Sequence, residues 1–201
     1  MRNFKIKFSL LISVLFLSSG VSSEENRFVE DKFAPIRDRL QTCFVCHGEN
    51  GVSTQPMFPI LAGQEFYYLY VQMKDFKSGL RENPIMGPLV ANIDKEDLRL
   101  MAEFFGEQEW QGTDFTTVPE QITAGRKVVD AGQCVACHLG AFNGNSRIPR
   151  LAGQHLEYLL KTMFDFKNNI RNNARPMNAL FGTFSDKEIE AIAEYLAGFK
   201  E

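Results

Sequence analysis

The second half of this chain repeats the first half, and this duplication limits the possible folds more than any other feature. CFVCH, which begins at Cys43, matches CVACH, which begins at Cys134, at an offset of 91 residues. PILAGQEFYYL from Pro59 matches PRLAGQHLEYL from Pro149 at an offset of 90 residues. A period of this length indicates two copies of one structural unit. Each copy has about 85 to 90 residues, so each core is small and would gain stability from a large apolar cofactor.

Within each copy, the apolar residues recur at helical spacing, and no segment alternates as a strand does. The segment from Gln64 to Lys77 is expected to form one amphipathic helix. Ser185, followed three residues later by Glu188, predicts a capping box at the start of the last helix, and Asp94 is the matching cap in the first copy. The sequence therefore predicts two small all-α domains.

The N-terminal residues have the layout of a secretory signal peptide. A basic start is followed by an apolar run from Phe8 to Leu17 and then by small residues. The run is too short for a spanning helix of roughly 20 residues; an uncleaved anchor is the alternative. We predict cleavage after Ser23 and export to the periplasm. The predicted organisation is a signal peptide at 1–23, a first domain at 24–106, a linker at 107–120 and a second domain at 121–201.

The mature chain is acidic, with 19 Lys and Arg against 25 Asp and Glu. It offers no basic stripe for nucleic acid, and no later segment is apolar enough to cross a membrane. The predicted protein is soluble or loosely associated with a membrane.

The two Cys-x-x-Cys-His motifs contain all four cysteines of the chain. A thioredoxin-like dithiol would need a βαβ context, and a zinc site would need more ligands than one motif supplies. Covalent haem accounts for every position, because two thiols attach to the porphyrin vinyl groups and the adjacent imidazole binds the iron. We therefore predict two haem c groups, attached through Cys43, Cys46, Cys134 and Cys137, with His47 and His138 as axial ligands.

The second axial ligand is expected to be methionine, because the chain has three histidines and two of them are used. Met86 and Met177 match across the repeat, and each lies 39 residues after its own motif histidine. Neighbouring Pro and Asn residues predict that both lie in loops; core packing is the alternative. Met73 and Met163 also match, but their helical spacing predicts a place in the core. The third histidine, His155, is expected on a helix surface.

Two further pairs are candidates for contacts around the haem. The carbonyls of Pro59 and Pro149, 12 and 11 residues after their histidines, could accept the second imidazole N–H; a simple helix stop is the alternative. Arg81 and Arg171 also match, and could bind haem propionates; a solvated helix end is the alternative.

These segments resemble the cytochrome c4 family: CFVCHGENG, PILAGQEFYYLYVQMKDFKSGLREN, the following Met, and a second half that repeats all three. The resemblance implies two tandem class I cytochrome c domains, each with one His/Met-ligated haem c. It also implies that the two domains face each other with their propionate edges close. Two departures concern the second copy, where CHLGAFNGNSR lacks the compact CHG turn and the segment RNNARPM, from Arg171 to Met177, has one more residue than RENPIM, from Arg81 to Met86.

The resemblance further implies an electron carrier between a quinol-oxidising complex and a terminal oxidase, and not an enzyme. An electron-accepting subunit of a periplasmic dehydrogenase, as in the oxidation of sulfur compounds, is the alternative. A di-haem peroxidase is a third possibility, but it needs a vacant axial site on one iron, and the sequence offers a methionine to both.

Overall fold

A computed structural model describes residues 31–200. The described chain is helical and has no strand, only an isolated bridge between Asn145 and Ile148. This confirms the predicted all-α class. In chain order, the elements are η1 (Ala34–Ile36), α1 (Arg37–His47), η2 (Glu49–Gly51), α2 (Phe66–Ser78), α3 (Met86–Val90), α4 (Lys95–Gly106), α5 (Pro119–Ala131), α6 (Val135–His138), α7 (Leu156–Lys167), α8 (Arg175–Phe181) and α9 (Asp186–Ala197).

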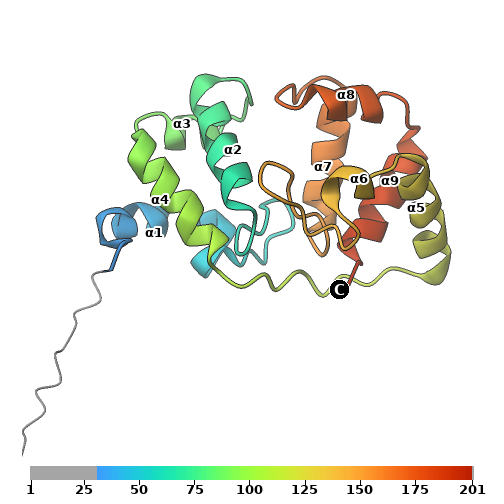
Figure 1. Cartoon of the computed structure of the whole chain (residues 1–201), viewed down its shortest axis with the longest axis horizontal. Helices are drawn as coiled ribbons and strands as arrows, with labels where there is room; N and C mark the ends of the chain where they lie inside the picture. Colours follow the sequence, from blue (N-terminus) through green and yellow to red (C-terminus); the bar gives the residue numbers. More distant parts are fainter. Residues whose placement is uncertain (1–30, 201) are drawn as a thin grey trace, which may run out of the picture. The chain divides into compact units, whose positions relative to one another are not determined.

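The first half is built around the contact of α2 with α4, which lie side by side in Figure 1. Leu69 of α2 and Leu98 and Phe105 of α4 are buried in this core. On α1, Phe44 packs against Phe104 and Phe105, which fixes the helix with the first cysteine motif to the rest of the half. Burial of such apolar side chains is the main stabilising contribution to a domain of this size.

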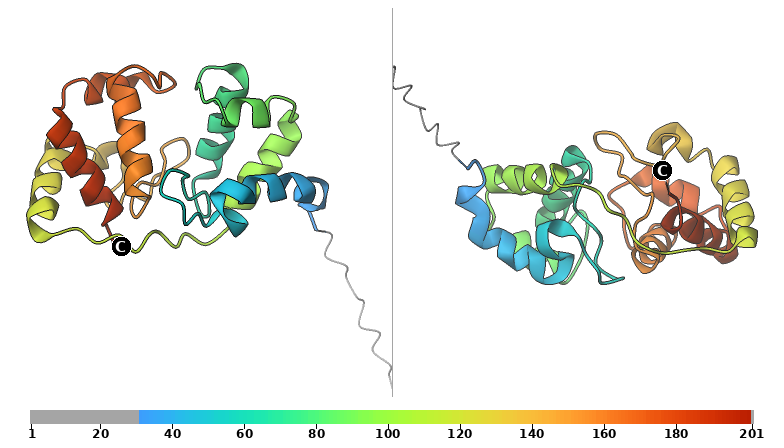
Figure 2. Two further views of the ribbon diagram at one scale, coloured as in Figure 1. Left: turned by 180° about the vertical axis from the view of Figure 1, so that it is seen from behind. Right: turned by 90° about the horizontal axis from the view of Figure 1, so that it is seen from below.

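The second half repeats this arrangement with α7 and α9 in contact, and α5 packs against the other side of α9 (Figure 2). Its core holds Leu159 and Met163 of α7 together with Ile189 and Ile192 of α9. Close packing is possible because Gly125 of α5 has no side chain; a Cβ there would lie 2.4 Å from the backbone oxygen of Ala191.

The last helix of each half begins at the predicted cap. The Asp94 carboxylate accepts from the Asp97 N–H at 2.8 Å. Ser185 accepts from the Glu188 N–H, and the Glu188 carboxylate accepts from the Ser185 N–H at 2.7 Å, which completes the capping box. These bonds satisfy N–H groups that have no partner inside the helix.

The helix that carries the cysteine motif differs between the halves. In the first half, Cys43, Cys46 and His47 all lie in the continuous helix α1. In the second half, α5 ends at Ala131, Gln133 has a φ of 52°, and the motif continues in the separate short helix α6. The left-handed backbone at Gln133 is the local cause of the break, because a residue at positive φ cannot continue a right-handed helix.

A non-helical segment joins α4 to α5 (Figure 1). Pro119 is the first residue of α5, so the last two positions of the predicted 107–120 linker are already helical. Proline is well suited to this first helical position, because its missing N–H would have no partner there. The predicted signal peptide and the first residues of the predicted 24–106 domain lie outside the described residues. No helix within 31–200 is long and apolar enough to span a membrane.

Two glutamines at equivalent positions connect the halves. The Gln64 amide accepts from the Arg150 N–H at 2.8 Å and donates to the Arg150 carbonyl at 3.0 Å. Reciprocally, Gln154 accepts from the Ile60 N–H at 2.9 Å and donates to the Ile60 carbonyl at 3.1 Å. Positions 60 and 150 also match across the repeat, so the contact has the reciprocal form of a two-fold symmetric interface.

Candidate functional site

The cysteine motifs place two thiols and one imidazole within a single helical turn in each half. Cys43 and Cys46 are three residues apart on α1, so they lie on the same face of the helix. Cys134 and Cys137 have the same spacing; Cys134 is the N-cap of α6 and Cys137 lies within this helix. All four cysteines are free, not paired as disulfides. Burial raises the pKa of the Cys43 thiol to about 11, which keeps it protonated at neutral pH.

Both motif histidines are buried and held by a proline carbonyl. His47 is 7% exposed and His138 is 8% exposed. The Nδ1 atom of His47 lies 2.9 Å from the Pro59 oxygen, and the Nδ1 atom of His138 lies 2.9 Å from the Pro149 oxygen. A carbonyl oxygen can only accept, so Nδ1 must donate in both rings.

The state of these two rings follows from that bond. Burial lowers the pKa of both imidazoles, and the proline carbonyls only partly offset this effect. A neutral imidazole that donates through Nδ1 has its lone pair on Nε2, which is the atom that an axial ligand needs. Pro59 and Pro149 thus make the contact that the sequence suggested.

The residue after each histidine adopts the same unusual backbone in the two halves. Gly48 has φ 75° and ψ 163°, and Leu139 has φ 66° and ψ 170°. This region is almost restricted to glycine. At Gly48, a Cβ would lie 2.1 Å from the Val52 oxygen, so the first half could not accept a leucine without rearrangement. The departure from CHG in the second motif is therefore a site of backbone strain.

Replacing Leu139 by Gly should increase the free energy of unfolding of the second half by about 1 kcal/mol, because relief of roughly 1–3 kcal/mol of strain exceeds the entropic cost of glycine. Chemical denaturation of the intact protein measures this change. Gly48→Ala is the reciprocal variant and should destabilise the first half. A Leu139→Gly protein less stable than wild type would contradict the strain argument.

Met86 and Met177 do not lie in loops, as the sequence suggested, but in short helices. Met86 is the first residue of α3, and Met177 is the third residue of α8. The prediction failed because proline, which was taken to exclude a helix, is tolerated in the first turn, and Pro176 occupies that turn of α8. Both methionines are half-buried at the margins of the two cores, whereas Met163 is 4% exposed within one of them.

Arg81 and Arg171 do not form solvated helix ends. Arg171 is only 6% exposed. Its guanidinium stacks over the Phe166 ring at 4.4 Å and donates to the Tyr68 hydroxyl of the first half at 3.3 Å. Arg81 stacks over the Phe76 ring at 4.5 Å and donates to the Tyr158 hydroxyl of the second half at 3.1 Å. Each arginine thus reaches the tyrosine of the opposite half.

Tyr68 and Tyr158 were missed in the sequence, although they match at an offset of 90 residues. Burial raises the pKa of Tyr158, but the charges of Arg81 and Arg171 more than offset this effect and lower the pKa to about 7. The phenol group is therefore held in a strongly positive environment.

His155 is buried, which contradicts the expected position on a helix surface. It is 9% exposed, and its Nε2 atom lies 2.9 Å from the Ser53 carbonyl of the first half. Because this carbonyl can only accept, Nε2 must donate to it, and a neutral ring then has no lone pair on that nitrogen.

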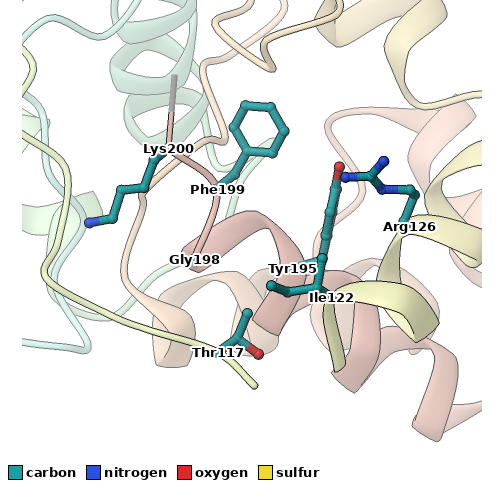
Figure 3. A pocket seen from close by; sticks show the side chains of 7 residues that line it. All are labelled: Thr117, Ile122, Arg126, Tyr195, Gly198, Phe199 and Lys200. Carbon is teal, nitrogen blue, oxygen red and sulfur yellow. The ribbon is translucent and has the colours of Figure 1, made fainter. Parts of the chain in front are cut away.

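One cavity of about 180 Å³ lies away from the cysteine motifs, where α5 and the end of α9 meet the segment before α5. Figure 3 shows the guanidinium of Arg126 next to the Tyr195 hydroxyl at its edge. None of the predicted cysteine, histidine or methionine ligands lines this cavity. Residues 31–200 also contain no group of three or more His, Cys, Asp or Glu that could hold a metal ion by themselves.

The residues of both halves fit a covalently bound haem. Each motif presents two free thiols and a neutral, oriented imidazole. Near the contact between the halves lie two arginines that have no carboxylate partner among the described residues, as expected for side chains that bind acidic groups such as propionates.

Comparisons with known proteins agree with this interpretation. Residues 120–196 match the family described as cytochrome C oxidase, cbb3-type, subunit III. Cytochrome c4 of Pseudomonas aeruginosa is 33% identical, with 80% of this chain and 85% of that protein covered. A protein of Stutzerimonas stutzeri named thiosulfate dehydrogenase electron acceptor is also 33% identical, with 77% of each chain covered.

A solved structure has the same fold. The crystal structure of reduced recombinant cytochrome c4 from Pseudomonas stutzeri superposes with a TM-score of 0.74 at 30% identity, covering 81% of this chain and 96% of that one. The likeness extends over both halves of the duplication. The chain therefore belongs to the cytochrome c4 family and is a di-haem electron carrier, not an enzyme, with two covalently attached haem c groups.

Proposed function

We propose that this protein carries single electrons in the periplasm from a quinol-oxidising complex to a terminal oxidase. The observation that carries this proposal is the duplicated histidine geometry, in which each buried imidazole is oriented by a proline carbonyl at 2.9 Å. A rigid, buried ligand reduces the rearrangement that accompanies a change in iron charge, which suits electron transfer.

The residues have distinct tasks in each half. We assign Cys43, Cys46, His47 and Met86 to the first haem, and Cys134, Cys137, His138 and Met177 to the second. The haem supplies a one-electron couple at iron. The thiols would attach the ring to the chain, and the imidazole and the methionine thioether would bind the iron, which would leave no open position for oxygen or peroxide. The Pro59 and Pro149 carbonyls set the orientation of the imidazoles.

The proposed location depends on residues 1–23, which lie outside the described chain. Their basic start and apolar run are typical of a signal peptide. We place the cleavage after Ser23 and the mature protein in the periplasm, where covalent haem attachment and exchange with respiratory complexes would both occur.

A second candidate function is that of electron acceptor for a periplasmic dehydrogenase. It is favoured by the similarity to the thiosulfate dehydrogenase electron acceptor of Stutzerimonas stutzeri, which is as high in identity as that to the Pseudomonas aeruginosa cytochrome. Modules of the same fold serve both tasks, so the partner has to be identified by kinetics.

Stopped-flow absorbance separates the two candidates. The oxidised protein should be reduced by a quinol-oxidising complex, and the reduced protein should be oxidised by a terminal oxidase, at rates at least about tenfold above those with thiosulfate and its dehydrogenase. The opposite order of rates would favour the acceptor function. Carbon monoxide is the control for a peroxidase, since its binding to the reduced, folded protein would reveal a vacant axial position.

A further inference from the structure

The two arginines at the contact between the halves form one connected unit. The Gln72 oxygen accepts from Arg81 Nη1 at 2.9 Å and from Arg171 Nη2 at 2.8 Å. It also accepts from the Asn173 amide at 2.9 Å. The position equivalent to Gln72 in the second half is Thr162, so one amide from the first half holds the arginines of both halves together.

No carboxylate of the described residues balances the positive charge of this unit. Within residues 31–200, no Asp or Glu forms an ion pair with either guanidinium. The neighbouring Asp75 carboxylate accepts from Asn173 at 2.7 Å instead. Arg171 is 6% exposed and Arg81 is half-buried, so water screens these two charges less than surface charges, and their field reaches further.

Each arginine also has contacts in both halves. Arg81 follows α2 and bonds Tyr158 of α7, while Arg171 follows α7 and bonds Tyr68 and Gln72 of α2. The backbone of Arg171 continues towards Met177, because its carbonyl accepts from the Asn178 amide at 2.7 Å. The charges are thus shared between the halves and do not belong to one half alone.

We infer that Arg81, Arg171 and Gln72 form a single positively charged unit that raises the reduction potentials of both haems together. Positive charge in a poorly screened environment stabilises the ferrous over the ferric state, since reduction removes one positive charge from the iron centre. By contrast, an arginine that paired only with the propionate of one haem would change mainly the reduction potential of that haem. This inference rests on the proposed assignment of one haem to each half.

The test is a redox titration of the full-length protein with both haems attached, followed by absorbance and fitted with two midpoints. Arg81→Gln and Arg171→Gln should each lower both midpoints, with a change of about tenfold in the ferrous-to-ferric ratio at a fixed potential, equivalent to about 59 mV. Gln72→Glu adds a negative charge of nearly the same shape between the arginines, and should also lower both midpoints.

Two controls separate charge from structural damage. Arg81→Lys and Arg171→Lys keep the charge and should retain most of the wild-type potentials, even if they weaken the hydrogen bonds. Arg99→Gln removes a 61% exposed guanidinium that pairs with Glu103 at 3.8 Å, and should leave both midpoints unchanged.

A shift in only one midpoint, or in neither, would overturn the inference. Lysine variants with the same shifts as the glutamine variants would also overturn it, because the effect would then be structural. The absorption bands of covalent, Met-ligated haem test the proposed function separately. If the wild type lacks these bands, the assignment of one Met-ligated haem to each half is wrong. If the bands are present but a variant shifts only one midpoint, the assignment stands and only the shared charged unit is refuted.

Discussion

Replacing Met86 or Met177 by Ala is expected to abolish about half of the near-infrared absorption of the ferric protein, since this absorption is typical of Met-bound haem iron and each methionine is assigned to one of two sites. One of the two reduction potentials should fall by an amount on the order of 100 mV, because loss of the thioether favours the ferric state. The double variant should lose the band. Absorbance spectra and redox titration measure both effects.

The other matched pair of methionines provides the control. Met73 packs against the first core and Met163 is buried in the second. Replacing either by Leu preserves the volume and should cost less than about 1.5 kcal/mol of stability, while the near-infrared band remains. If Met73→Leu removes the band and Met86→Ala does not, the ligand assignment is wrong.

Loss of both cysteines of the second motif should expose that half to proteases. The core formed by α5, α7, α8 and α9 alone is small. A haem that packs only in the folded half stabilises the folded form over the unfolded form, as any such ligand does. In the Cys134→Ala, Cys137→Ala double variant, cleavage within residues 119–200 should be at least about tenfold faster than in the wild type, which corresponds to a loss of about 1.4 kcal/mol.

Mass spectrometry of a timed digest identifies the half that is cut. The Cys43→Ala, Cys46→Ala variant is the matched control, and should reverse the order of cleavage between the halves. Equal resistance of the two halves in both variants would show that each fold is stable without its haem.

The local features of this chain were predictable from the sequence because they depend on near neighbours. The capping box of Ser185 and Glu188 and the cap at Asp94 formed as predicted. The helix expected from Gln64 to Lys77 runs from Phe66 to Ser78, a shift of two residues at its start, where helix ends are least well determined by sequence. The duplication extended these predictions from one half to the other.

The contacts between the halves could not be predicted in this way. Tyr68 and Arg171 are separated by 103 residues, and His155 and Ser53 by 102. Hydrophobic periodicity assigns a polar residue to solvent, so it placed His155 on a helix surface, and it could not decide between haem contacts and solvated helix ends for Arg81 and Arg171. Each arginine stacks on a ring of its own half, but the packing of one half on the other supplies polar partners that a single repeat lacks: Tyr158 for Arg81, Tyr68 for Arg171 and the Ser53 carbonyl for His155.

The paired glutamines have a consequence for how such an interface can change. In a homodimer, every substitution appears twice, so both sides of a two-fold contact must tolerate it. Here the halves are joined in one chain, and equivalent positions can differ: Glu65 accepts from the Ser146 N–H, whereas its counterpart His155 binds the Ser53 carbonyl. Gln64 and Gln154 keep the same hydrogen bonds on both sides of the contact. The adjacent positions, Glu65 and His155, make different contacts, so the two domains can differ in structure and properties although their interface is nearly symmetric.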